Sequence, residues 1–430
     1  MILANGRVFS SEEQSTVLEQ MEPELNETLA AKPLSPEAVI EAIGQLGEKI
    51  ADGVFDERIR ALPLEGADRL IQEMLPLLRR ESLAYKLRME LGEEPFGIQR
   101  TAPPLGQKPM TVRPMPLGTL LHIAAGNIDG LPAFSVVEGL LTGNINILKL
   151  PQADNGVSLQ ILQELIRIEP ALAPYIYVFD TPSSDLPGLR RMADFCDGIV
   201  VWGGDEAVAA VQNFAPPGVR LIEWGHKLGF AYLSAFENQQ EDLAALALHI
   251  LSTNQLLCSS CQTIYIDTED MEELYTFCQA FLPILEAAAV DYPTESLGAA
   301  AEITLRRYTA VLESVLSGHH EAPERVFQGR RCSLKACCDS RLELSDMFGN
   351  CLVKRLPRSQ LLPCLRKHKG YLQTAGLICP EDQREELTAL LARCGVVRVT
   401  RGGGMSAYFS GEAHDGEYPL RRYIRYVNIE

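Results

Sequence analysis

The chain has 430 residues, of which 46% are hydrophobic and 22% charged, and its formal net charge is −18 at pH 7. This length exceeds what one compact core serves, so we expect a globular protein of two or three domains. The acidic excess disfavours nonspecific binding to nucleic acid and to anionic membrane surfaces, because both reward lysine and arginine. An anionic ligand therefore needs a locally basic or N–H-lined site.

Targeting and redox signals indicate a cytoplasmic protein. Residues 1–9 lack an apolar core after a basic start, and no run of about 18 apolar residues follows, so we expect neither a signal peptide nor a membrane span. The chain has 11 cysteines at irregular spacing, which is not the pattern of a secreted disulfide framework. We expect most of them to be reduced and buried.

Residues 1–95 are predicted to form an N-terminal helical region. Ser35 can cap a helix, Pro36 suits its first turn, and Val39, Ile43 and Leu46 follow at helical spacing. A second helical run covers 67–91. Prolines and glycines over 95–116 break the periodicity and predict a linker or an extended crossing segment.

Residues 96–228 are predicted to form a dinucleotide-binding domain. Short runs that are apolar throughout alternate with helical runs; the strand candidates are 118–125, 145–150, 175–180, 198–203 and 219–225, and the helices between them are 131–141, 158–168, 186–195 and 205–214. Such strands suit a parallel sheet covered by helices on both faces, where dinucleotides bind at the carboxyl ends of the strands.

A second α/β set predicts a separate domain over 229–399. Its helix candidates are 240–253 and 271–288, and its strand candidates are 229–235, 262–267, 351–356, 372–379 and 396–400. The remaining residues, 400–430, contain three glycines at 402–404 and end in a polar and aromatic tail. We expect this C-terminal arm to be partly β.

Cys258 is a candidate nucleophile because it lies where a predicted helix gives way to a loop and then to a β-rich run. A thiol in such a place can be exposed, oriented and kept as a thiolate. With Cys261 it forms C-S-S-C, which could be a redox pair or half of a zinc site; Cys332, Cys337 and Cys338 are too irregularly spaced to complete the latter. A regulatory disulfide and simple core packing of Cys261 stay open.

Other motifs carry weaker signals. No G-x-G-x-x-G follows a strand, and Gly203 with Gly204 could be only a tight turn before a helix. His319 and His320 lie in a polar, turn-like stretch that favours a surface loop over a metal site. The basic stretch 330–338 could contact a coenzyme A phosphate, although a solvated loop is favoured.

The segments HIAAGN, ILKLPQ, VWGGDEA, IEWGHK and NQLLCSSCQ follow one another in an order that resembles the aldehyde dehydrogenase superfamily. The resemblance covers 100–430 and is closest to the LuxC-like branch, the fatty acyl-CoA reductases of bacterial luminescence. It implies an aldehyde dehydrogenase-like α/β fold with a Rossmann-type cofactor domain, an α/β catalytic domain and a ligand cleft between them.

The resemblance implies catalytic roles for three residues. Cys258 matches the nucleophile, and Asn127 matches the side-chain amide that forms an oxyanion hole with the Cys258 N–H. Without the other motifs, Asn127 beside Gly126 would be interpreted as a turn residue. Glu223 matches the glutamate that activates water in hydrolytic members, a task that a reductase does not need. His226 and Lys227, on the same segment, are weaker candidates.

The resemblance also implies a cofactor site for NADPH or NADH. Lys149 matches the position that binds the adenosine ribose or the adjoining phosphate, and Gln152 replaces the glutamate of NAD-preferring members, which favours NADPH. Gly203 and Gly204 match the turn that admits the pyrophosphate to a helix N-terminus. The second glycine of that pattern is Val208 here, which puts the pose of the pyrophosphate in question. Asp346 matches a loop residue near the nicotinamide ribose.

The function implied is NAD(P)H-dependent reduction of an acyl-CoA or acyl thioester to an aldehyde through an acyl group bound to Cys258. One alternative is an aldehyde dehydrogenase that oxidises an aldehyde to the acid, with Glu223 as base. A noncatalytic scaffold of the same fold is the other alternative. The resemblance further implies a homo-oligomer and an acyl-protein synthetase as partner.

Overall fold

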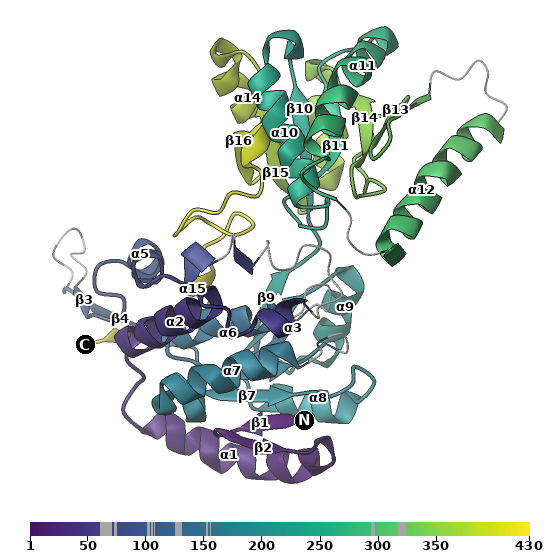
Figure 1. Ribbon diagram of the computed structural model, residues 1–430. Helices are drawn as coiled ribbons and strands as arrows, with labels where there is room; N and C mark the ends of the chain where they lie inside the picture. The colour runs from purple at the N-terminus through teal and green to yellow at the C-terminus, as the bar shows by residue number, and fades with distance from the viewer. Residues whose placement is uncertain are drawn as a thin grey trace. The chain divides into compact units, whose positions relative to one another are not determined.

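The computed structural model describes residues 1–60, 71–72, 75–100, 104, 106, 108–124, 131–151, 154, 156–293, 297–316 and 324–430. The chain forms two compact units (Figure 1). Unit 1 comprises Met1–Gly225 and Tyr408–Glu430, and unit 2 comprises His226–Ala407. The expected helical region, most of the expected dinucleotide-binding segment and the end of the C-terminal arm thus share one unit. Asn127 and Gln152, together with His319 and His320, lie outside the described residues.

Unit 1 is built on a seven-stranded sheet of order β2-β1-β7-β6-β5-β8-β9. Its strands are β1 (Ile2–Ala4), β2 (Arg7–Phe9), β5 (Thr119–Ile123), β6 (Ile145–Lys149), β7 (Ile176–Phe179), β8 (Gly198–Trp202) and β9 (Arg220–Trp224). The chain enters at β5, continues to β7 on one side and then crosses to β8 and β9 on the other, with all five strands parallel. The predicted strands are confirmed, and their order creates a topological switch point between β5 and β8.

The first two strands form a hairpin that the sequence prediction missed. β1 pairs antiparallel with β2 and, on its other side, with β7. Asn5 and Gly6, which connect the two strands, have φ of 46° and 73°. Positive φ at both central residues is typical of a type I′ turn, for which Asn-Gly is the favoured pair. The signal was therefore present in the sequence.

The helices of unit 1 include those predicted between the strands. They are α1 (Gln14–Ala30), α2 (Pro36–Ala51), α3 (Asp56–Arg60), α5 (Arg80–Leu91), α6 (Leu131–Leu141), α7 (Val157–Ile168), α8 (Leu186–Asp194), α9 (Asp205–Phe214) and α15 (Pro419–Arg422), with 3-10 turns at Ser11–Glu13, Leu75–Leu78 and Pro170–Tyr175. Ser35 caps α2 as predicted, since its hydroxyl accepts from the Ala38 N–H at 3.5 Å. α2, α6 and α7 pack against one another.

The central sheet of unit 1 is buried on both faces. On β5, Leu121 belongs to the large core under the helices, whereas its neighbour Leu120 packs on the opposite face with Val200 and Tyr423. This alternation follows from the two-residue period of a strand. Tyr423 belongs to the C-terminal segment, which therefore completes the second face of the sheet.

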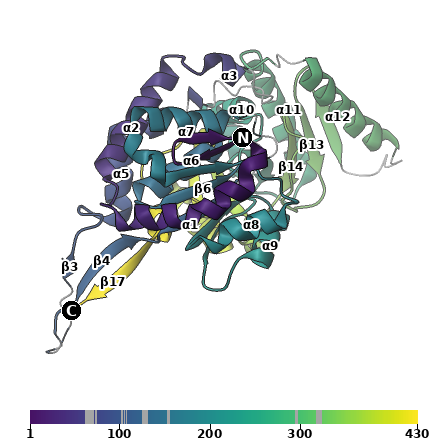
Figure 2. The ribbon, with the colours of Figure 1, turned by 90° about the horizontal axis from the view of Figure 1, so that it is seen from below.

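The C-terminal segment also forms a three-stranded ribbon with residues expected to be a linker. β17 (Ile424–Ile429) pairs antiparallel with β4 (Thr111–Pro116), and β4 pairs with β3 (Gln99–Arg100). Figure 2 shows β4 and β17 extending together from the rest of unit 1. Glu90 anchors the segment, because its buried carboxylate accepts from the Leu420 N–H at 2.7 Å.

Unit 2 contains a second seven-stranded sheet, of order β12-β13-β14-β11-β10-β15-β16. Its strands are β10 (Leu228–Leu233), β11 (Cys261–Ile266), β12 (Arg325–Gln328), β13 (Ser333–Cys337), β14 (Asn350–Arg355), β15 (Leu372–Ile378) and β16 (Arg398–Arg401). Only β12 runs antiparallel among the strands described. The helices are α10 (Gln240–Ser252), α11 (Met271–Ala288), α12 (Leu297–Leu316), α13 (Leu361–Leu365) and α14 (Glu381–Cys394), with 3-10 turns at Phe236–Asn238, Arg358–Gln360, Arg366–His368 and Gly402–Gly404.

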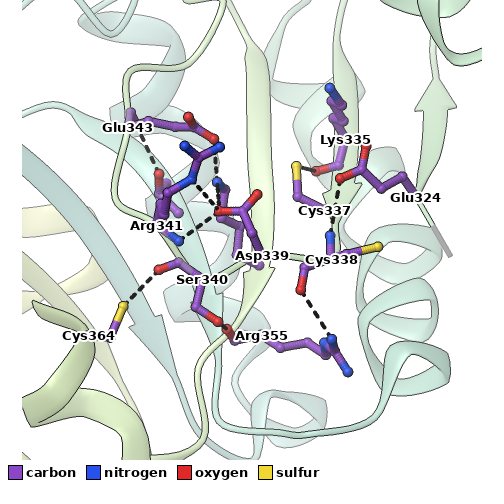
Figure 3. Close-up of polar contacts among 12 residues, drawn as sticks. Glu324, Lys335, Cys337, Cys338, Asp339, Ser340, Arg341, Glu343, Arg355 and Cys364 are labelled. Atoms are coloured by element: carbon purple, nitrogen blue, oxygen red, sulfur yellow. Dashed lines mark hydrogen bonds and ion pairs between the residues drawn. The ribbon is translucent and has the colours of Figure 1, made fainter. Parts of the chain in front are cut away.

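The stretch 332–338 was predicted to be a solvated loop, and that prediction is wrong. Ser333–Cys337 is strand β13, and Cys332 and Cys337 are buried. The polar segment after it is held by its neighbours (Figure 3): the Cys364 thiol donates to the Ser340 carbonyl at 2.9 Å, and the Ser340 hydroxyl donates to the Arg355 carbonyl at 2.7 Å. The sequence prediction missed this strand because Ser333 and Lys335 interrupt its apolar pattern.

No described helix is both long enough and apolar enough to cross a membrane.

Candidate active site

Cys258 lies on a compact turn between α10 and β11. The turn is closed by backbone hydrogen bonds from Leu256 N to Thr253 O at 3.0 Å and from Ser260 N to Leu257 O at 2.9 Å. The Ser260 hydroxyl also accepts from Leu257 N at 3.0 Å. Cys258 itself is exposed. The helix-to-strand turn thus presents the thiol to solvent, as the sequence predicted for a nucleophile.

Gln255 holds the base of this turn. Its φ is 60°, and its side chain is fully buried. The amide nitrogen donates to the Cys261 carbonyl at 2.9 Å, and the amide oxygen accepts from Gly349 N at 3.1 Å. A buried amide that satisfies backbone groups on two sides fixes both of them, because leaving either group unpaired costs about 1–3 kcal/mol. No motif in the sequence indicates this role.

His249 supports the other end of the turn. Its Nε2 accepts from the Cys261 N–H at 3.2 Å, and its Nδ1 lies 2.9 Å from the Ser406 hydroxyl. Burial, with a smaller effect of Arg398, lowers the pKa of His249 to about 4, so the ring is neutral near pH 7. Because Nε2 is an acceptor, the proton sits on Nδ1 and is donated to Ser406. His249 is a structural residue of the turn rather than a base.

Gly229 gives the turn the space that it occupies. A Cβ at this position would lie 2.5 Å from the Ser260 carbonyl oxygen and 2.7 Å from that of Ser259. Both atoms belong to the backbone that follows Cys258, so they cannot rotate away as a side chain would. Gly229 pairs with Cys261 at a register shift between β10 and β11. The glycine therefore lets the nucleophile turn pack directly on β10.

Gln373 contacts the nucleophile and was missed by the sequence analysis. It lies on β15 and is only 6% exposed. Its amide nitrogen donates to the Cys258 sulfur at 3.3 Å. A glutamine inside an apolar strand carries no motif, so only its burial beside Cys258 identifies it.

Cys261 differs from Cys258 in every respect that decides reactivity. It is 1% exposed, and its thiol donates to the Thr263 carbonyl at 3.6 Å. Burial raises the pKa of Cys261 to about 12, so it stays a thiol. Of the alternatives left open, core packing is the one that the structure shows. Both cysteines are free thiols, and no described group of three His, Cys, Asp or Glu residues could hold a metal.

The other ten thiols of the chain are less exposed than Cys258, which makes them less reactive. Eight cysteines are buried, two are half-buried, and Cys258 is the exposed one. Burial raises the pKa of each of the ten cysteines other than Cys258. Because the thiolate is the nucleophilic form of cysteine, burial makes these ten thiols less reactive.

The loop that carries Asp346 is joined to the nucleophile turn within unit 2. Gln262 Oε1 accepts from Ser345 N at 3.2 Å, and Phe348 N donates to Asn254 O at 3.1 Å. Asp346 is exposed on this loop. The structure therefore places the loop beside the turn, as expected for two parts of one site.

In unit 1, the predicted cofactor residues gather at the carboxyl ends of the parallel strands. Lys149 ends β6, and Gly203 and Gly204 follow β8; these two strands flank β5. Glu223, which was predicted as a catalytic residue, lies on β9, next to β8. Cys258 belongs to the other unit.

Lys149 is a buried cation at this edge. It is 4% exposed, and its ammonium donates to the Ser183 hydroxyl at 2.9 Å. Burial lowers the pKa of Lys149. Among its described neighbours no carboxylate pairs with it, so the site favours an anion that would restore the full charge.

Gly203 and Gly204 form the turn from β8 into α9. A Cβ on Gly204 would meet no atom within 4 Å, so its surface is open to a ligand, whereas one on Gly203 would lie 2.9 Å from the Ala207 Cβ. Gly204 is the N-cap of α9, but Asp205 and Glu206 occupy the first turn. These carboxylates already complement the helix dipole and oppose a phosphate at the same place. The fit of a pyrophosphate here is therefore partial.

Glu223 is half-buried on β9, and its carboxylate accepts from Gln212 on α9 at 2.7 Å. Among the described residues, no ion pair involves Glu223. Lys227, the weaker candidate nearby, donates to the Gly370 carbonyl at 3.0 Å and so has a structural contact.

Comparisons with known proteins identify a family and a set of relatives for this chain. The model of the family "Acyl-CoA reductase (LuxC)" matches residues 31–426. The long-chain acyl-protein thioester reductase of Photorhabdus luminescens is 24% identical over 335 residues, which is 76% of this chain and 66% of the relative. That of Vibrio harveyi is 24% identical over 328 residues, 74% of this chain and 65% of the relative. The matches thus span just under two thirds of these relatives.

Solved structures share the fold. An NADP-dependent glyceraldehyde-3-phosphate dehydrogenase from Bacillus halodurans C-125, complexed with NADP, superposes with a TM-score of 0.72 at 13% identity over 100% of this chain and 98% of that chain. An NAD-dependent benzaldehyde dehydrogenase from Corynebacterium glutamicum gives 0.66 at 13% identity, over 99% and 91%. The predicted aldehyde dehydrogenase-like α/β fold is confirmed, and the chain belongs to the acyl-CoA reductase (LuxC) family.

Proposed function

We propose that this protein reduces an acyl thioester to an aldehyde through an acyl group carried on Cys258. The observation that supports it best is the contrast among thiols: Cys258 is exposed on a braced turn, and burial raises the pKa of every other cysteine. The family and the names of its relatives, which act on acyl-protein thioesters, agree with this substrate class.

The chain's own part in the reaction begins with attack of the Cys258 thiolate on the thioester carbonyl. The new C–S bond forms as the bond to the departing thiol, coenzyme A or a carrier protein, breaks, and that thiolate takes up a proton. Asn127 and the Cys258 N–H are proposed to hold the oxyanion, where preorganised donors contribute about 3–4 kcal/mol each. After reduction, the thiohemiacetal on Cys258 collapses to free aldehyde and thiolate.

A reduced nicotinamide dinucleotide would supply the hydride for the acyl carbonyl. Lys149, Gly203 and Gly204 are proposed to hold it. This is supported by the open surface over Gly204 and by the buried ammonium of Lys149, which donates to the Ser183 hydroxyl and has no carboxylate partner among the described residues. NADPH is favoured because Gln152 cannot repel a 2′-phosphate as a glutamate would. Equal affinities for NADPH and NADH would refute that preference.

The wider setting is part of the proposal. An acyl-protein synthetase is proposed as donor, in agreement with the acyl-protein thioester that the relatives' names give as substrate. A homo-oligomer is supported by apolar side chains on the β3–β4–β17 ribbon and just before it, since Tyr426 is 60% and Ile98 60% exposed. A cytoplasmic location suits a chain whose 11 thiols are all free.

The test is NAD(P)H consumption with a panel of acyl-CoA thioesters, with the product identified and the acylated enzyme trapped for mass spectrometry. We expect aldehyde as product and the acyl mass on the peptide that contains Cys258. Cys258→Ala should abolish turnover, whereas Cys261→Ala, which removes a buried thiol three residues away, should keep most of it. Free acid as product would favour the oxidising alternative with Glu223. Unchanged turnover in Cys258→Ala would overturn the proposal.

A further inference from the structure

Gln373 occupies a position that the proposed chemistry does not yet use. It is the second residue of β15, it is only 6% exposed, and its amide nitrogen lies 3.3 Å from the Cys258 sulfur. Strand β10 pairs with both β11 and β15. Cys258, just before β11, and Gln373, near the start of β15, therefore lie at the same end of the two strands that flank β10.

The orientation of the amide is fixed by its surroundings. The Thr374 hydroxyl donates to Gln373 Oε1 at 3.4 Å, so the oxygen end of the side chain is engaged and the NH₂ end faces the sulfur. The backbone is held as well, because Val397 N donates to the Gln373 carbonyl at 3.3 Å. A buried, pinned amide cannot turn its oxygen to the sulfur without losing the contact with Thr374.

An N–H donor acts differently on the two protonation states of a cysteine. A thiolate accepts a hydrogen bond strongly, whereas a neutral thiol accepts it weakly, so the donor favours the thiolate. Because the thiolate is the attacking species, such a donor increases the reactive fraction at neutral pH.

We propose that Gln373 is a further catalytic residue, whose amide N–H stabilises the Cys258 thiolate before it attacks the thioester. The catalytic role of Gln373 rests on the proposed function, in which Cys258 is the nucleophile, whereas its effect on the sulfur can be measured independently of the substrate. Once the acyl group is attached, the sulfur carries no charge, and this stabilisation ends. The interaction therefore acts on the free nucleophile and not on the acyl-enzyme.

The experiment is the rate of alkylation of Cys258 by iodoacetamide between pH 6 and 9.5, followed by mass spectrometry of its peptide. We expect Gln373→Met to shift the midpoint of the rate profile upward by about one pH unit, the scale of one hydrogen bond to an ionised group. At pH 7 the thiolate fraction would fall about tenfold, but its nucleophilicity would rise about threefold, leaving a loss of about threefold in rate. Gln373→Glu, which keeps the shape and adds like charge, should shift the midpoint further.

The controls separate this effect from changes elsewhere. Gln279→Met alters an exposed glutamine on α11 and should keep the wild-type profile. The other titratable or charged groups on segments around the turn are the same in all variants: His226, Lys227, His249, Asp346 and Arg398. Should Gln373→Met not fold, Gln373→Glu and Gln373→Asn carry the test. Wild-type midpoints in the folded variants would overturn the inference. An active Cys258→Ala enzyme would overturn the proposed function and with it the catalytic role of Gln373, while a shifted midpoint in Gln373→Met would still show its effect on the sulfur.

Discussion

Gly229→Ala is expected to damage the nucleophile turn without touching any catalytic side chain. The added methyl carbon would lie 2.5 Å from Ser260 O, 2.7 Å from Ser259 O and 2.9 Å from Ser259 C. Ordinary van der Waals contact begins at 3.4 Å, so the backbone after Cys258 must move by almost 1 Å. Gly229 has no positive φ, so the whole effect is steric. Overpacking of this kind costs about 1–3 kcal/mol, and a 1 Å displacement of a reacting group costs about 100-fold in rate.

The assay is single-turnover acylation of Cys258 together with thermal unfolding. We expect acylation to slow by about 10- to 100-fold, and the unfolding transition of unit 2 to fall by several degrees. Gly225→Ala is the matched control, because a Cβ there meets no atom within 4 Å. If Gly229→Ala acylates as fast as Gly225→Ala, the packing of the turn on β10 does not position the sulfur, and the reasoning fails.

Two further predictions concern charge. Lys149→Met should weaken dinucleotide binding at least tenfold in a fluorescence titration. Lys32→Met, at an exposed site in unit 1, should leave the affinity unchanged. Equal affinities of the two variants would show that the buried ammonium does not contact the ligand. Burial lowers the pKa of His122 to about 4, and that of His249 likewise, from 6.5. Stability from each neutral ring is complete above pH 6.5 and is lost as the pH falls toward 4, by about 1.4 kcal/mol per pH unit per histidine. Both tryptophans, Trp202 and Trp224, lie in unit 1, so urea unfolding followed by fluorescence reports the His122 effect; a pH-independent midpoint between 6.5 and 4.5 would contradict it.

The sequence predicted the strands and helices of the parallel sheets well because each is marked by its own residues. The runs that became β5 to β8 are mostly apolar, and α8 begins at the capping residue Asp185. The elements missed were those whose pattern is mixed. β13 has a serine and a lysine among its five residues, and its burial depends on packing against α11 and pairing with β14.

The candidate site divides along the same line. Cys258, Lys149 and the glycine pair could be predicted because each is a residue type with a known chemical role and lies at the end of a helix or strand that the sequence predicts. Gln255, His249, Gly229 and Gln373 could not, because each acts through one contact with a residue that the fold brings near. Gln373 follows Cys258 by 115 positions, and no local pattern connects them.

The residues that hold the nucleophile therefore depend more on the fold than the nucleophile itself does. Cys258 would be exposed on many helix-to-strand turns, but an exposed thiol on a loose turn has no fixed direction and no fixed donor. Here Gln255 and His249 satisfy the backbone at Cys261 from two sides, Gly229 admits the turn to the surface of β10, and Gln373 faces the sulfur. The side chains of Gln255, His249 and Gln373 are buried polar groups, whose burial is stable only while their partners stay in place. The orientation of the reactive sulfur thus depends on the packing of unit 2. A substitution that loosens this packing is expected to disturb the orientation of the sulfur before the unit unfolds.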